Sequence, residues 1–144
     1  MFTFAGEHIT KGVINMIIAV DFDGILCEDA FPEIGKPKYP VISAVRQLID
    51  AGHEVILWTS RVDERLKDAV KWCSDYGLRF CAVNGNAPTN VLKYGTDPRK
   101  VYADVYIDDR SLLFLRDQRL YRKPMTTAIT SEINFILNTI QEEN

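Results

Sequence analysis

The feature that most constrains the fold is a short, wholly apolar run that stops at a carboxylate. Residues 16–20 read Met-Ile-Ile-Ala-Val, and Asp21 follows directly. A continuous run of this length, rich in β-branched residues, is typical of a strand that is buried on both faces. The sequence therefore predicts a buried strand with acidic residues at its carboxyl end.

Further apolar runs alternate with helical periodicity along the rest of the chain. The expected later strands cover residues 54–59, 79–83, 103–107 and 112–115. The expected helices carry apolar stripes at Val41, Val45, Leu48 and Ile49, at Val62, Leu66, Val70 and Cys73, and at Ile133, Ile136, Leu137 and Ile140. Pro40 suits the first turn of the first helix, and Gly52 suits the position beyond its end. Strands that alternate with helices predict an α/β fold, a Rossmann-like three-layer sandwich with a central parallel sheet.

The chain shows no repeat and no linker, so we expect residues 1–144 to form one domain. Residues 1–15 are expected either to pair as an edge strand or to be an extension upstream of Met16. Residues 27–39 and 84–99 carry prolines and glycines with little periodicity and are expected to be long functional loops that contact substrate.

Composition excludes several classes of function. A net charge of −3 without a dense Lys/Arg run predicts no nucleic-acid partner. The apolar runs are too short to span a bilayer, which predicts no membrane segment. Three cysteines at unrelated spacings argue against a disulfide framework and predict a reducing, cytoplasmic location. The oligomeric state is not predicted.

Polar side chains gather where the expected strands end. The first strand delivers Asp21 and Asp23, the second Thr59 and Ser60, and the fourth Asp108 and Asp109, with Lys100 a few residues upstream. Each of these alone is more often part of a turn, a helix cap or a solvated loop than of an active site. Four carboxylates at one edge of one sheet, however, would repel one another unless a cation neutralised them. Oxygen ligands without His or Cys favour Mg²⁺.

This arrangement suits phosphate chemistry. An aspartate beside Mg²⁺ can attack phosphorus and form an aspartyl-phosphate, and a second carboxylate two residues on can serve as acid and base. A hydroxyl and a lysine can hold the phosphoryl oxygens. The sequence thus predicts a magnesium-dependent enzyme that acts on a small phosphorylated substrate.

Three segments resemble signatures of the haloacid dehalogenase-like (HAD) superfamily. Asp21-Phe22-Asp23-Gly24-Ile25-Leu26 is similar to the first signature, Leu57-Trp58-Thr59-Ser60-Arg61 to the second and Tyr106-Ile107-Asp108-Asp109 to the fourth. The resemblance covers roughly residues 16–115. It implies a Rossmann-like domain that hydrolyses phosphate esters with Mg²⁺.

The resemblance also implies roles for single residues. Asp21 would be the nucleophile and a metal ligand, and Asp23 would be the acid/base with its backbone carbonyl on the metal. Thr59 and Ser60 would bind phosphate, and Asp108 and Asp109 would complete the metal site. The third-signature lysine is either Lys93 or Lys100, and Lys100 is preferred because it lies shortly before the fourth strand. Ile25 departs from the usual Thr, and residues 27–39 leave room only for a flap, as in a small capless member.

Other functions fit parts of the same pattern. A nucleotidase or a phosphotransferase of the same superfamily is an alternative within enzymes. A receiver-like signalling domain also carries acidic residues, a Thr/Ser and a Lys, although in a different order along the chain. A non-catalytic protein that keeps the fold is a further alternative.

Overall fold

The structure is a computed structural model that describes residues 15–111 and 125–142. Its main sheet has four parallel strands in the order β5–β4–β1–β6, and β2 pairs with β3 in a separate antiparallel hairpin. The strands are β1 (Ile17–Val20), β2 (Cys27–Ala30), β3 (Glu33–Pro37), β4 (Glu54–Leu57), β5 (Ala82–Val83) and β6 (Val105–Ile107). The helices are α1 (Tyr39–Asp50), α2 (Asp63–Asp75), α3 (Pro88–Tyr94) and α5 (Met125–Glu142).

Strand β1 lies inside the sheet, between β4 and β6. Its last residue, Val20, is level with Leu57 of β4 and with Ile107 of β6. The residues that follow these three strands therefore emerge at one edge of the sheet. The chain winds outward from β1 through β4 to β5 and then returns to β6 on the other side, so the β1–β6 boundary is the point at which the strand order reverses. Ligands of open α/β sheets bind at such a point.

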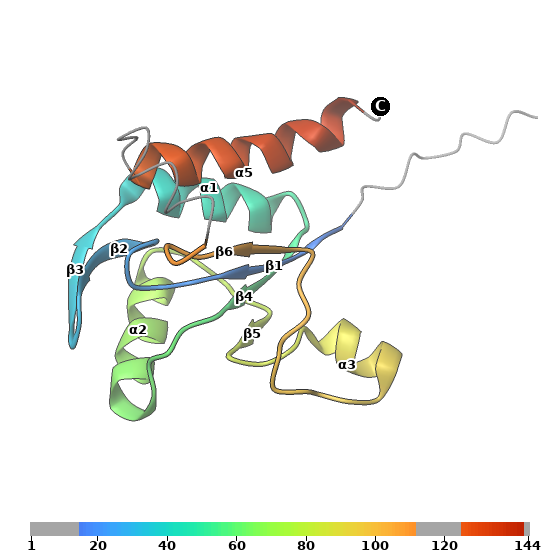
Figure 1. Cartoon of the computed structure of the whole chain (residues 1–144), viewed down its shortest axis with the longest axis horizontal. Coiled ribbons are helices and arrows are strands. Elements are labelled where there is room, and N and C mark those ends of the chain that lie inside the picture. The colour runs from blue at the N-terminus through green and yellow to red at the C-terminus, as the bar shows by residue number, and fades with distance from the viewer. Residues whose placement is uncertain (1–14, 112–124, 143–144) are drawn as a thin grey trace, which may run out of the picture.

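Helices cover both faces of the sheet, which confirms the predicted three-layer α/β fold. Side chains alternate along β1, so Ile18 and Val20 point to one face and Ala19 to the other. The first two belong to a large buried cluster with residues of α1, α2 and α5, and α5 packs alongside α1 (Figure 1). Ala19 belongs to a smaller cluster with Ala87 and Val101, which flank α3.

Helix α1 confirms its prediction closely. Val41, Val45 and Leu48 are fully buried, and Pro40 lies in the first turn. Gly52 follows the helix with φ +92°, a conformation that favours glycine. Periodicity succeeded here because one face of the helix is apolar and the opposite face is not.

Helix α2 exists where it was expected, but its predicted inward stripe is wrong for Val62 and Val70 and right for Cys73. Val62 is 63% exposed, and Val70 is also exposed. The buried residues are Ala69 and Cys73. These small side chains let the helix approach the sheet, while Leu66 and Val70 lie at its margin, where they line a hollow with Val83 of β5.

The strands are shorter than predicted, and both expected loops contain regular structure. Of residues 79–83 only Ala82–Val83 form a strand. Residues 27–39 are not a structureless flap, because they form the β2–β3 hairpin, which projects from the sheet (Figure 1). Residues 84–99 contain the helix α3. The expected strand at residues 112–115 lies outside the described residues, as do residues 1–14.

Two further findings bear on location. No helix in the described ranges has the length and apolar character needed to cross a bilayer. Cys27, Cys73 and Cys81 are all free thiols. The cytoplasmic location itself stays a prediction.

Candidate functional site

A cavity of about 550 Å³ opens at the carboxyl edge of the sheet. The residues that line it come from the ends of β1, β4 and β6 and from the hairpin: Asp21, Asp23, Asp29, Phe31, Trp58, Thr59, Ser60, Arg61, Asp108, Asp109 and Arg110. Six of the predicted site residues are thus brought together, namely Asp21, Asp23, Thr59, Ser60, Asp108 and Asp109. The register of the parallel strands is the cause, because it places all three strand ends at one level.

One wall of the cavity is acidic. Asp21 continues β1 and its backbone N–H donates to the carbonyl of Ile107, so it lies beside the end of β6. Burial, the charge of Asp108 and a hydrogen bond with Asp109 raise the pKa of Asp21 to about 8, although the N–H of Phe22 opposes the shift. Burial also raises the pKa of Asp109. Without a cation, the carboxyl group of Asp21 therefore retains a proton near neutral pH.

The same three aspartates fit a divalent cation. Asp21, Asp108 and Asp109 each offer one carboxylate oxygen, and these oxygens lie within 4.8 Å of one another. An all-oxygen, carboxylate-rich set suits Mg²⁺ better than zinc or copper. A cation here would also replace the proton that the crowded carboxylates hold.

Gly24 and Lys38 lie next to these acidic residues, although neither is among the described residues that line the cavity. Gly24 has φ +84°, and a Cβ at this position would lie 2.4 Å from the Oδ2 atom of Asp109. Only glycine therefore leaves Asp109 its place beside Asp21. The carbonyl of Gly24 accepts a hydrogen bond of 2.9 Å from the Nζ atom of Lys38. Burial lowers the pKa of Lys38, and the charge of Asp109 opposes that shift, which places the ammonium near the acidic wall.

The end of β4 supplies the hydroxyl groups. The N–H of Thr59 donates to the Oδ1 atom of Asn84 (2.8 Å), and the Oγ1 atom of Thr59 accepts from the N–H of Arg61 (3.2 Å). Asn84 follows β5 with φ +49°. Its side-chain amide thus fixes the turn that presents Thr59 and Ser60 to the cavity.

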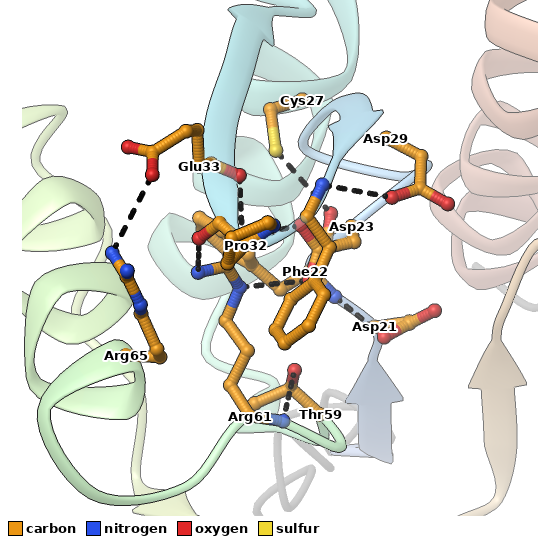
Figure 2. A network of polar contacts seen from close by, with 11 residues as sticks. Asp21, Phe22, Asp23, Cys27, Asp29, Pro32, Glu33, Thr59, Arg61 and Arg65 are labelled. Atoms are coloured by element: carbon orange, nitrogen blue, oxygen red, sulfur yellow. Dashed lines mark hydrogen bonds and ion pairs between the residues drawn. The ribbon is translucent and has the colours of Figure 1, made fainter.

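Asp23 lies in a different environment from Asp21. The Nε atom of Arg61 donates to its Oδ2 atom (2.8 Å) and the Nη2 atom donates to its Oδ1 atom (2.7 Å). Arg61 is 2% exposed, and the bond with Asp23 raises the pKa of the guanidinium. Figure 2 shows this guanidinium between Asp23 and the backbone of the hairpin.

The structure does not bring the predicted lysines to the cavity. Lys100 is exposed, and Lys93 lies in the last turn of α3 with its ammonium over the ring of Tyr94. None of residues 84–99 is among the described residues that line the cavity, contrary to the expectation for that loop. The hairpin does contribute, through Asp29 and Phe31.

Sequence reasoning missed two basic residues. Arg61 stands within the second-signature segment, directly after Thr59 and Ser60. The sequence therefore showed that it lies near the site, but not that it pairs with Asp23. Lys38 carried no signal, because it reaches Gly24 only when residues 27–37 fold back as a hairpin. In both cases the contact depends on the path of that hairpin.

A solved structure of a conserved protein from Bacteroides thetaiotaomicron is similar to this chain. The two share 34% sequence identity over 76% of this chain and 93% of the Bacteroides chain, with a TM-score of 0.61. This chain belongs to the same family as that protein. No family model and no curated protein matches the sequence. The relative is described only as conserved, so its likeness supports the fold and leaves the chemistry to the geometry of the site.

Proposed function

We propose that the protein is a magnesium-dependent phosphohydrolase of the HAD type, which cleaves small phosphate monoesters through an aspartyl-phosphate on Asp21. The observation that carries the proposal is the acidic wall. Asp21, Asp108 and Asp109 crowd together at the point where the strand order reverses, and the hydroxyl groups of Thr59 and Ser60 lie across the same cavity.

In the first step a carboxylate oxygen of Asp21 attacks phosphorus. The bond between phosphorus and the ester oxygen breaks, and the leaving oxygen takes a proton from the carboxyl group of Asp23. In the second step a water molecule gives a proton back to Asp23 and attacks the phosphorus. The bond to Asp21 then breaks, which releases inorganic phosphate and restores both carboxyl groups.

Asp21, Asp108 and Asp109 would hold Mg²⁺, and the backbone carbonyl of Asp23 is the further ligand that the HAD resemblance implies. When bound, the ion would neutralise the acidic wall and the charge on the phosphoryl oxygens. Thr59, Ser60 and the ammonium of Lys38 would bind the remaining charge of the phosphate. Lys38 replaces Lys100 in this proposal, because its Nζ atom contacts the carbonyl of Gly24 within reach of the charge of Asp109, although Lys38 does not itself line the cavity.

A nucleotidase is the second candidate. Phe31 and Trp58 line the same cavity as the carboxylates, and Phe31 is 62% exposed. An exposed aromatic ring such as that of Phe31 beside a phosphate site favours a substrate with a planar ring, because such rings stack. This candidate shares the chemistry of the first and differs only in the group that the phosphate leaves.

The experiment is a panel of phosphate monoesters assayed with Mg²⁺ and with EDTA. The panel includes an aryl phosphate, sugar phosphates and nucleoside monophosphates. We expect turnover that requires Mg²⁺, and acid quenching during turnover should trap phosphate on Asp21, identified by peptide mass. The matched control is Asp21→Asn, which cannot form the acyl-phosphate. Turnover that persists in EDTA, or phosphate trapped elsewhere, would refute the proposal.

A further inference from the structure

The guanidinium of Arg61 makes four hydrogen bonds to two separate parts of the chain. Two go to the carboxylate of Asp23. The other two go to the turn of the hairpin, from Nη1 to the carbonyl of Pro32 (3.1 Å) and from Nη2 to the carbonyl of Glu33 (2.8 Å). An arginine has five N–H donors, so these contacts occupy most of them.

Two aromatic rings also contact this guanidinium. Its central carbon lies 5.2 Å from the ring of Phe22 and 5.2 Å from the ring of Phe31. Phe22 is fully buried beside Asp21 and Asp23, whereas Phe31 belongs to the hairpin turn and lines the cavity. Like the hydrogen bonds, the two ring contacts therefore join Arg61 both to the segment after β1 and to the hairpin.

The hairpin has few other attachments near its turn. Strand β2 is exposed from Glu28 to Ala30, and the hairpin forms a sheet of its own. The other charged contact there joins Arg65 to Glu33 at 3.8 Å, between exposed side chains. Exposed pairs of this kind contribute little, and a lone two-stranded hairpin is marginal in water. Arg61 is therefore the principal polar anchor of the turn among the described residues.

We propose that Arg61 is a positioning residue that couples the hairpin to Asp23, so that contacts of the substrate with the hairpin orient the acid/base carboxyl group. This inference rests on the proposed function for the acid/base role of Asp23. The coupling of the hairpin to Asp23 through Arg61 does not depend on that role. The bidentate bond fixes the plane of the Asp23 carboxylate. Each carboxyl oxygen has a second lone pair, so one of them can carry the proton that the leaving oxygen takes while Arg61 holds the direction of the group.

The kinetic test compares Arg61→Lys with wild type on two substrates. An aryl phosphate has a good leaving group that needs little protonation, and an alkyl phosphate has a poor one that needs the proton. Lysine keeps the charge but cannot make the bidentate contact or hold the turn. We expect kcat for the alkyl phosphate to fall at least about tenfold more than kcat for the aryl phosphate. The ratio of the two KM values should stay within about twofold of its wild-type value, because both esters present the same phosphate to the site.

The matched control is Arg65→Ala, which removes the other arginine that faces the hairpin. It should leave both kcat values and both KM values at wild-type levels. Arg61→Met provides the second comparison, because it removes the charge and keeps much of the packing. If Arg61→Lys kept full turnover of the alkyl phosphate and Arg61→Met did not, the positive charge alone would suffice and the positioning role would be overturned.

A measurement without turnover tests the coupling itself. Amide hydrogen exchange of residues 28–36 should accelerate in Arg61→Lys, because the turn loses its anchor. It should also accelerate in Asp23→Asn, which weakens the same anchor from the other end. Asp21→Asn and Arg65→Ala should leave exchange in the hairpin unchanged. This arm needs only folded protein, which thermal unfolding verifies for each variant.

The two readouts separate the two proposals. If wild type hydrolyses no phosphate ester, the proposed function fails, and hydrogen exchange alone decides the coupling. If wild type is active, an equal fall in kcat for the alkyl and the aryl phosphate in Arg61→Lys overturns the positioning role. Hairpin exchange that responds to Arg61→Lys but not to Asp23→Asn overturns the coupling, because Arg61 would then hold the hairpin without help from Asp23.

Discussion

Asp21 and Asp23 follow the same strand, two residues apart, yet the charges around them have opposite signs: negative around Asp21 and positive beside Asp23. Asp21 faces Asp108 and Asp109, and its pKa is raised to about 8 by burial and by its acidic neighbours. Asp23 is matched atom for atom by a buried arginine. One carboxyl group is short of positive charge and the other is fully paired. In the proposed function the acidic wall would receive a cation, whereas the carboxylate of Asp23 already has the guanidinium of Arg61 as its partner.

The largest expected difference between the two aspartates is in turnover. Asp21→Asn should lower kcat by about a thousandfold or more for every ester, because the nucleophile is lost. Asp23→Asn should lower it by about a hundredfold for alkyl phosphates and much less for aryl phosphates, because only the proton is lost. Initial rates at saturating Mg²⁺ provide the measurement. Equal losses across leaving groups in Asp23→Asn would contradict its acid/base role.

Thermal stability without metal should change in opposite directions. In EDTA at pH 8, Asp21→Asn should raise Tm by about 5 °C, because it removes a charge from the acidic wall. Asp23→Asn should lower Tm by about 5 °C or more, because it leaves the buried guanidinium without a charged partner. Differential scanning calorimetry measures both. A fall in Tm for both variants would mean that the acidic wall is not strained without a cation.

The stability of the metal-free protein should also depend on pH through Asp21. Its pKa rises on folding from 3.8 to about 8, so the folded state holds an extra proton between these values. Stability therefore falls as the pH rises from about 4 to about 8. Saturating Mg²⁺ should remove most of this dependence, and its affinity should increase over the same range because binding displaces the proton. Asp21→Asn should flatten the metal-free profile, and an unchanged profile would refute the assignment.

The smallest expected effect concerns the lysine beside the acidic wall. Lys38→Met should raise KM for phosphate esters by about tenfold, because one positive charge beside the phosphate site is lost. Lys36→Met is the matched control, since Lys36 is exposed on β3, two residues before Lys38. Lys100→Ala and Lys93→Ala should match wild type within error. A rise in KM for Lys100→Ala but not for Lys38→Met would restore the assignment made from the sequence.

Local sequence patterns predicted the parts of the fold in which apolar residues are buried and acidic residues follow the end of a strand. The apolar run before Asp21 became the buried strand β1, and the stripe of α1 is buried as expected. The carboxylates at the strand ends meet because parallel strands share an edge. The same reasoning misjudged α2, because Val70 and Leu66 outweigh Ala69 in any hydrophobic count although the smaller residue faces the sheet.

The missing parts of the site depend on contacts between segments that are distant in sequence. Arg61 meets the carbonyl of Pro32 across 29 positions, and Lys38 meets Gly24 across 14. Residues 27–39 show no alternation of apolar and polar residues, because most of the hairpin lies outside the core. Without a periodic signal, neither the hairpin nor its two basic partners could be derived from the sequence.

The base of the hairpin is closed by backbone hydrogen bonds, which makes the hairpin a separable insertion in the domain. The N–H of Gly24 donates to the carbonyl of Cys27, and the N–H of Lys38 donates to the carbonyl of Leu26, both at 2.9 Å. The segment therefore leaves the domain and returns to it at almost the same place. Such a segment can lengthen, shorten or be exchanged between relatives without disturbing the parallel sheet. Under the proposed function, evolution could thus alter the choice of substrate here while the reaction stays the same, and grafting hairpins between relatives would be the corresponding route for engineering.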